Sequence, residues 1–308
     1  MHIFVRNLCA AIAVVSLILL NPAAFAKSFY VEGEGGVPLA VTTTGNPDGP
    51  EILFLHGLSM GASSFSKQFE SKLAEEFRIV AFDLRGHALS GKPSEVSAYD
   101  KPEIWAKDVE RVMEATGLQR PILVGWSYGS LVAADYLRTF GTAKTSGLVM
   151  VGALGGFTPF FPPDGGLDPT ILTNITRMRE LRSSPSFDNQ REATELFIPM
   201  LSEGQIDLEW KKKAQQLAMM VPPYVREPLQ SHSTDNTDIV GILGELPVMV
   251  LHGSEDPSVS QGGLAALRTL VPHLKVHTIE GVGHSPFATR PDEFNEALAS
   301  FVRNVRKE

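Results

Sequence analysis

Short runs of mainly apolar residues recur along the chain from residue 52 onward. They cover residues 52–55, 79–82, 122–124, 148–151, 248–251 and 276–279. A strand that is apolar at every position is covered on both faces, whereas strict alternation indicates one solvent-facing side. The runs therefore predict parallel strands in a sheet that has helices on both faces.

Helical patterns fill the intervals between these runs. They cover residues 65–75, 101–116, 130–140, 262–269 and 292–302. Before the second of them, Asp100 and Glu103 have the spacing of a capping box, and Pro102 fits a first helical turn. This alternation predicts an α/β fold with a mostly parallel, doubly wound sheet and right-handed crossovers. In such sheets ligands bind beyond the carboxyl ends of the strands.

Two segments depart from the alternation. Near the start, β-prone residues 29–31 and 39–44 flank a glycine-rich turn, which predicts an antiparallel pair at one edge of the sheet. Residues 155–246 contain no strand-like run and have helical patterns joined by prolines. We interpret this segment as a helical cap, inserted over the carboxyl edge of the sheet after the fourth apolar run. The predicted core comprises residues 27–154 and 247–308.

The N-terminus has the pattern of an export signal. Arg6 precedes an uncharged run over residues 8–20, and Ala24-Phe25-Ala26 supplies the small residues of a cleavage site. The run is shorter than the roughly 20 residues that a membrane-spanning helix needs. We therefore expect residues 1–26 to be a signal peptide that is cleaved after Ala26. The mature protein would be periplasmic or secreted, with no stable membrane anchor.

Composition narrows the possible partners further. The net charge is −8 at pH 7 and there is no basic stripe, which disfavours nucleic-acid binding. The one basic run, residues 211–213, fits a solvated helix face. The only cysteine, Cys9, would leave with the signal peptide, so no structural disulfide is expected. No metal-ligand spacing and no glycine-rich phosphate loop occur, so we expect no metal and no cofactor, and a small-molecule substrate as partner.

The candidate nucleophile is Ser127, in the sequence Gly125-Trp126-Ser127-Tyr128-Gly129. An apolar run precedes this pentapeptide and a helical pattern follows it, which predicts a sharp turn between a strand and a helix. Such a turn needs small residues two positions before and after the serine, because a Cβ there would clash with neighbouring chain. The turn would also direct the amide of Tyr128, at a helix N-terminus, toward the space in front of the hydroxyl.

A serine hydroxyl needs a base, and the base needs a group that fixes its tautomer. Asp256 follows the apolar run at 248–251, and His284 lies in a glycine-rich loop after the last run. Glu255 competes with Asp256 for the acid role, but the spacing from Gly253 favours Asp256. The order Ser127, Asp256, His284 is the chain order of the α/β-hydrolase triad.

On these residues the chain resembles the α/β-hydrolase superfamily over residues 28–303, particularly its capped esterase, lactonase and cofactor-free haloperoxidase-like branch. Two further motifs and the predicted helical cap carry the resemblance. The pair His56-Gly57 is similar to the loop that supplies a second oxyanion amide, which by position is that of Leu58. Residues 83–90 resemble the Asp-x-Arg-Gly-His-Gly-x-Ser loop of the superfamily, with Ala88 in place of the second glycine.

The remaining histidines have structural interpretations. We expect His56 to shape the oxyanion loop, His87 to brace its own loop, and His252 to support the acid loop. Three others, His232, His273 and His277, have no motif around them and are expected at the surface or in structural roles. Asp83 also follows an apolar run, but Arg85 offers it an ion pair.

Methionine and aromatic residues are frequent in the predicted cap. They are Phe157, Phe160, Phe161, Met178, Met200, Trp210, Met219 and Met220. Such side chains suit an acyl or aromatic pocket. At helical spacing, however, most of them are expected to form the core of the cap itself.

Together these features predict a secreted serine hydrolase that cleaves an ester or related acyl bond of a small, largely apolar substrate. Perhydrolysis, acyl transfer and cleavage of a carbon-carbon bond use the same machinery and stay open. Serine rather than aspartate at position 127 argues against dehalogenases and epoxide hydrolases. A protein of another class, a small-molecule binder without turnover, is the alternative.

Overall fold

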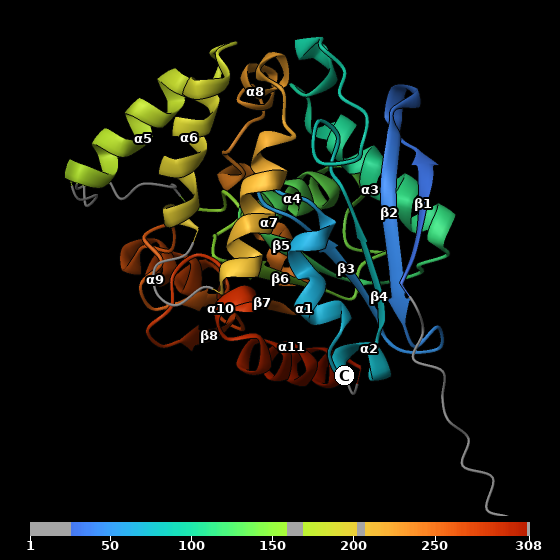
Figure 1. The fold of residues 1–308 in the computed structure, drawn as a ribbon. Helices are drawn as coiled ribbons and strands as arrows, with labels where there is room; N and C mark the ends of the chain where they lie inside the picture. Colours follow the sequence, from blue (N-terminus) through green and yellow to red (C-terminus); the bar gives the residue numbers. More distant parts are fainter. Residues whose placement is uncertain (1–25, 159–168, 202–206, 307–308) are drawn as a thin grey trace, which may run out of the picture.

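The structure is a computed structural model and describes residues 26–158, 169–201 and 207–306 of the 308-residue chain. Eight strands of this part form one sheet in the order β1-β2-β4-β3-β5-β6-β7-β8 (Figure 1). Their bounds are β1 Lys27–Glu32, β2 Pro38–Gly45, β3 Glu51–Leu55, β4 Arg78–Phe82, β5 Ile122–Trp126, β6 Gly147–Val151, β7 Val248–Gly253 and β8 Lys275–Ile279. The predicted signal peptide, apart from Ala26, lies outside the described residues.

Strand directions follow the sequence prediction. β1 pairs with β2 and β2 with β4 in the antiparallel sense, whereas every pair from β4 through β3 to β8 is parallel. The mostly parallel sheet with an antiparallel pair at one edge is therefore confirmed. The carboxyl ends of β3, β5, β6, β7 and β8 then lie along one side of the sheet.

Both faces of the sheet are covered, as predicted. The covering helices include α3 Pro102–Thr116, α4 Tyr128–Phe140, α9 Gln261–Leu270 and α11 Pro291–Val305 (Figure 1). In β3, Ile52 joins a hydrophobic cluster with Phe294 of α11, and the next residue, Leu53, joins a second cluster with Val132 of α4. Alternate strand residues thus enter two separate cores, which explains the continuous apolar runs.

β8 is the exception to this pattern. It is the last strand of the sheet, and Lys275 and Thr278 are exposed while His277 is half-buried. The expectation that this strand is buried on both faces is wrong, because at the edge of the sheet its side chains border solvent. Its polar residues suit that position, since exposed apolar edges invite pairing with other chains.

The helix boundaries differ from the predictions at two points. The predicted capping box of α3 is wrong, because the helix begins at Pro102 and its N-cap residue, Lys101, makes no side-chain cap. A residue before proline is held in extended backbone, which moves the cap position from Asp100 to Lys101. The predicted helix at 65–75 is broken. Ser71 accepts from the amide of Leu73 and donates to a carbonyl of the preceding turn, which separates the pieces.

The pieces of this broken helix are η2 Ala62–Phe65, α1 Ser66–Phe69 and α2 Leu73–Glu76. None of the helices in the described ranges combines the length and the hydropathy that a membrane span requires.

Between β6 and β7 the described chain contains only helices. They are α5 Pro169–Arg182, α6 Phe187–Met200, α7 Leu208–Met219, α8 Pro223–Leu229 and η4 Thr237–Glu245. α5 and α6 lie side by side (Figure 1) and share a small cluster that includes Met178 and Met200. Trp210 of α7 instead packs in a core cluster of the sheet and donates from Nε1 to the Ser64 carbonyl at 3.0 Å. Phe160 and Phe161 lie outside the described residues.

A buried ion pair joins three distant segments of the core. Nε and Nη2 of Arg85 contact the two carboxylate oxygens of Asp108 on α3 at 2.7 and 2.6 Å, and both side chains are buried. Arg85 also donates to the carbonyls of Glu34 and Ala98, at 3.0 Å each, and the Glu34 amide donates to Asp108 at 2.8 Å. The β1–β2 turn, α3 and the loop after β4 are thereby held together.

Replacing one member of this pair should destabilise the fold strongly. In Arg85→Met, Asp108 would be a buried charge without a counterion, which typically costs about 3–5 kcal/mol. The free energy of unfolding from urea titration measures this effect. The control is Arg111→Met, also on α3, because the Arg111–Glu114 pair is exposed and such pairs contribute about 0–1 kcal/mol. Equal losses in the two variants would contradict the role given to Arg85.

Candidate active site

Ser127 lies in a strained turn between β5 and α4. Its φ is 52° and its ψ is −116°, a region that residues with a side chain rarely occupy. A Cβ on Gly129 would lie 2.1 Å from the Leu55 carbonyl oxygen, and one on Gly125 would lie 2.6 Å from the Gly129 oxygen. The crowding that the pentapeptide predicted is therefore present at both glycines.

Two backbone amides near Ser127 are unused. Tyr128 is the first residue of α4, and Leu58 lies in a turn after β3 that the Met60 amide closes on the Gly57 carbonyl at 3.1 Å. Neither the Tyr128 nor the Leu58 amide donates a hydrogen bond to another residue in the described part of the chain. Gly57 lies against the nucleophile, since a Cβ on it would be 3.4 Å from that of Ser127.

His284 and Asp256 lie in contact beyond the ends of β8 and β7. Nδ1 of His284 is 3.0 and 3.1 Å from the two carboxylate oxygens of Asp256. Both residues are buried. When Nδ1 donates to the Asp256 carboxylate, the neutral imidazole has its lone pair on Nε2. This is the tautomer that a general base requires.

The loops after four parallel strands meet around this pair. A Cβ on Gly152, just after β6, would lie 2.9 Å from Asp256 Oδ2 and 3.1 Å from His284 Nδ1. The Ser127 amide donates to Val151 at the end of β6 at 2.9 Å, and Trp126 donates from Nε1 to the His284 carbonyl at 2.9 Å. No hydrogen bond joins the Ser127 hydroxyl to His284 here, and such bonds are often long before substrate binds.

His56 and Asp83 hold the turn that contains Leu58. Nε2 of His56 accepts from the Leu84 amide at 2.9 Å, so Nδ1 donates to the Gly57 carbonyl at 2.8 Å. Asp83 accepts from the amides of Ala62 and Leu89 at 2.7 and 2.9 Å. Burial raises the pKa of Asp83, and these amides oppose the rise. The predicted Asp83–Arg85 ion pair is wrong, since Arg85 is directed at Asp108.

Ala88 occupies a left-handed position in the loop at residues 83–90. The φ of Ala88 is 35°, so alanine adopts the left-handed backbone that favours glycine. Nδ1 of His87 hydrogen-bonds to the Arg85 carbonyl at 2.9 Å within the same loop. Alanine at position 88 therefore adopts a backbone conformation that carries local strain.

His232 has a role that the sequence did not indicate. It is buried, its Nε2 is 2.5 Å from Asp135 on α4, and its ring is centred 5.0 Å from both Trp105 and Tyr128. It therefore ties the segment after α8 to the nucleophile helix. No motif surrounds His232, so only the pairing across space identifies it.

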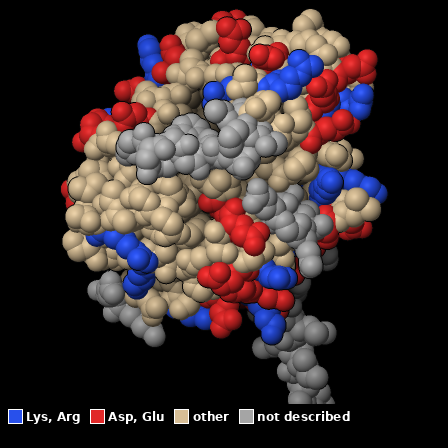
Figure 2. Space-filling view, turned by 90° about the vertical axis from the view of Figure 1, so that its left-hand side faces the viewer, with Lys and Arg blue, Asp and Glu red and all other residues tan. Residues whose placement is uncertain are grey.

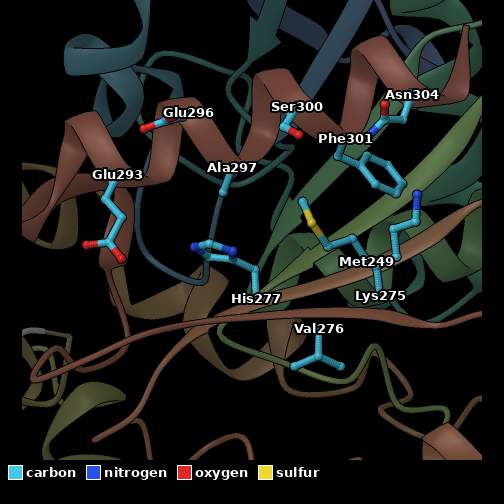
Figure 3. A pocket seen from close by; sticks show the side chains of 10 residues that line it. All are labelled: Met249, Lys275, Val276, His277, Glu293, Glu296, Ala297, Ser300, Phe301 and Asn304. Atoms are coloured by element: carbon cyan, nitrogen blue, oxygen red, sulfur yellow. The ribbon is translucent and has the colours of Figure 1, made fainter.

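The other histidines lie apart from Ser127. His252 hydrogen-bonds through Nδ1 to the Gly253 carbonyl at 2.9 Å and through Nε2 to Thr278 at 3.1 Å, as expected of a structural residue. His273 is exposed. His277 lines a surface hollow of about 530 Å³ between β8 and α11, facing Ala297 (Figure 3). None of the residues that line this hollow belongs to the Ser127 site.

The described residues include no candidate metal centre, and the face shown in Figure 2 carries no broad basic patch. Within the described ranges, no group of three or more His, Cys, Asp or Glu side chains is arranged to hold a metal ion. On the face shown in Figure 2, Lys and Arg occur in small separate groups with Asp and Glu nearby.

Comparison with known proteins identifies the family. The sequence model of the alpha/beta hydrolase family matches residues 52–297, most of the chain. The chain belongs to the alpha/beta hydrolase family. This hydrolase is 25% identical over 278 residues to a non-heme chloroperoxidase from Streptomyces lividans, covering 84% of this chain and 94% of the relative. It is also 25% identical over 288 residues to a bifunctional esterase/perhydrolase from Acinetobacter calcoaceticus, covering 89% and 99%.

A solved structure gives the same result. The crystal structure of an esterase from Rhodococcus sp. ECU1013 superimposes on this hydrolase with a TM-score of 0.76 at 29% identity, covering 90% of this chain and 99% of that one. The hydrolase therefore lies in the esterase and haloperoxidase-like branch of the family, in agreement with the resemblance noted from its motifs.

The close approach at Gly129 should make even a methyl group disruptive. In Gly129→Ala the added Cβ would meet backbone, not a side chain that can move, so we expect a loss of about 3 kcal/mol in the free energy of unfolding. The control is Gly262→Ala in α9, where no atom lies within 4 Å of the new Cβ. That variant should be unchanged or more stable by up to about 1 kcal/mol. Comparable urea midpoints for the two would refute the packing argument.

Burial of His56 predicts an acid-sensitive fold. Burial lowers the pKa of His56 to about 4 from 6.5. Between these values the unfolded chain binds a proton that the folded chain does not, so stability is complete above pH 6.5 and falls toward pH 4. This histidine should account for about 3 kcal/mol of that loss. The free energy of unfolding should therefore depend less on pH in His56→Asn; an unchanged slope would exclude the effect.

Proposed function

We propose that this hydrolase cleaves carboxylic esters through an acyl-enzyme on Ser127. The observation that carries the proposal is the strained backbone of Ser127. A φ of 52° is costly for a residue with a side chain, and such strained conformations cluster at active sites. The hydrogen-bonded pair His284–Asp256 and the unused amides of Leu58 and Tyr128 support it. In this proposal Ser127 is the nucleophile, His284 the base and Asp256 the group that orients the base.

The proposed reaction has two steps. The Ser127 hydroxyl attacks the ester carbonyl while its proton moves to Nε2 of His284. As the bond to the alcohol breaks, His284 returns this proton to the leaving alcohol, and the acyl group stays on Ser127. Water then gives a proton to His284 and attacks the acyl-enzyme. The bond to the Ser127 oxygen breaks, the acid leaves, and His284 returns the proton to that oxygen.

The Leu58 and Tyr128 amides would stabilise the oxyanion formed in each step. A single donor of this kind contributes about 2.7–4 kcal/mol to transition-state stabilisation. The turn that contains Leu58 is held by hydrogen bonds of His56 and Asp83. Little reorganisation would then be needed when charge develops on the carbonyl oxygen.

Other reactions of the same acyl-enzyme differ only in the second nucleophile. One relative is named a bifunctional esterase/perhydrolase, and hydrogen peroxide or an alcohol could replace water on this chain as well. We favour water because it needs no dedicated binding site. A ligand-binding protein without turnover would gain nothing from a strained serine turn or from a histidine held by an acid.

Replacing Ser127 tests the proposal. In Ser127→Ala, turnover of p-nitrophenyl acetate should fall at least about 1,000-fold because the acyl-enzyme cannot form. Thermal stability should be nearly unchanged. The control is Ser300→Ala on the exposed side of α11, which should keep full activity.

A fluorophosphonate probe gives an independent readout. It should label the wild-type protein and Ser300→Ala but not Ser127→Ala. Persistent turnover in Ser127→Ala would exclude this serine as the nucleophile. A wild-type protein that binds small esters but neither turns over nor reacts with the probe would instead be the ligand binder.

A further inference from the structure

Two arginines between β6 and β7 are buried without an acid partner among the described residues. Arg182, the last residue of α5, is 8% exposed, and Arg226 of α8 is 3% exposed. A buried charge normally needs a counterion or a full set of hydrogen bonds, because leaving water is costly. The two arginines meet this requirement to different degrees.

Arg226 has a structural explanation. Its guanidinium donates to the carbonyls of Ala218 and Val221 at 2.9 Å each and to that of Arg182 at 3.3 Å. Ala218 lies in the last turn of α7, where unpaired carbonyls and the helix dipole favour a positive charge. These hydrogen bonds therefore explain how Arg226 can be buried without an acid partner.

Arg182 is much less satisfied. Nη2 donates to the Ser59 hydroxyl at 2.6 Å, and the guanidinium lies 5.5 Å from the centre of the Phe197 ring. Its Nε and Nη1 donate to no other described residue, and no described carboxylate is within ion-pair distance. Burial, reinforced by the charges of Arg226 and Arg179, lowers the pKa of Arg182 to about 10, so the side chain stays charged at neutral pH.

The position of Arg182 connects it to the active site. It lines a narrow cavity of about 10 Å³ with Ser59, Thr194 and Phe197. Ser59 follows Leu58 directly, and its φ of 60° places it in the turn that presents the proposed oxyanion amide. The Ser59 hydroxyl accepts from Arg182 and keeps its own proton to donate. The cavity is large enough for about one oxygen atom.

We propose that Arg182 and Ser59 form a subsite for a carboxylate at the far end of the acyl chain. This inference rests on the proposed function and names its substrate class: half-esters of short dicarboxylic acids. One carboxylate oxygen enters the cavity and accepts from Arg182 and from the Ser59 hydroxyl. The ester carbonyl then reaches the Leu58 amide through a short spacer, because Leu58 and Ser59 are adjacent residues.

The subsite makes the substrate preference depend on charge rather than on apolar area alone. An Arg–carboxylate contact is charge-assisted and fixes the orientation of the partner. A neutral acyl chain of equal length would leave the Arg182 donors unpaired. The wild-type enzyme should therefore have a higher kcat/KM for monoethyl glutarate than for ethyl pentanoate, which has an acyl chain of equal carbon number.

Substitution of Arg182 tests the subsite. In Arg182→Gln, kcat/KM for monoethyl glutarate, followed by pH-stat, should fall about 10- to 100-fold, the range of a hydrogen bond to a charged group. That for ethyl pentanoate should fall by a smaller factor, so that the ratio of the two values drops. Arg182→Lys should keep part of the preference because it keeps the charge. Arg179→Gln, an exposed arginine of the same helix, should match the wild type on both esters.

Two further results separate this proposal from the proposed function. Equal losses on both esters in Arg182→Gln would overturn the subsite and make Arg182 a positioning residue for the Leu58 turn. Binding of glutarate to Ser127→Ala, measured by calorimetry, should be lost when Arg182→Gln is added. That measurement needs no turnover, so it tests the subsite even if Ser127 is not the nucleophile, and glutarate binding unaffected by Arg182→Gln would reject it.

Discussion

The site depends on a close contact between main chains beneath the nucleophile. Gly129 lies against the Leu55 carbonyl, and Gly125 lies against the first turn of α4, with no room for a side chain at either position. This contact fixes β3, β5 and α4 relative to one another. It therefore sets the separation between Ser127 and the turn that carries Leu58. The groups that would perform chemistry lie in loops, but the loops begin at strands that this contact holds in place.

Features with a local signal were predictable from the sequence. Beyond their first residues, β3, β4, β5, β6 and β7 are buried on both faces and almost entirely apolar, so the run itself indicates the element. The turn at Ser127 requires small residues at two fixed positions, and the chain has them. The contact between Asp256 and His284 followed from strand order, since both come after neighbouring parallel strands. The edge strand β8 carries polar residues, so its pattern said less about burial.

Pairs that form across the fold could not be predicted in the same way. Arg85 is near Asp83 in sequence but binds Asp108, and His232 binds Asp135 on another element. A side chain's type shows that it needs a partner, but the packing of distant segments selects which one. The same holds for Arg182 and Ser59, which are joined only when α5 lies over the turn after β3. The capping box predicted at Asp100 does not form, because Pro102 holds the preceding residue, Lys101, in extended backbone and makes it the N-cap.

The order of strands in the sheet has a consequence for biosynthesis. β5 lies at the middle of the sheet and is made early, whereas β7 and β8, which end next to Asp256 and His284, are made last and complete one edge. On the proposed mechanism, a chain that is still being translated carries its nucleophile without its base. Esterase activity then begins only when the final strands have been added, so incomplete chains stay chemically inert inside the cell.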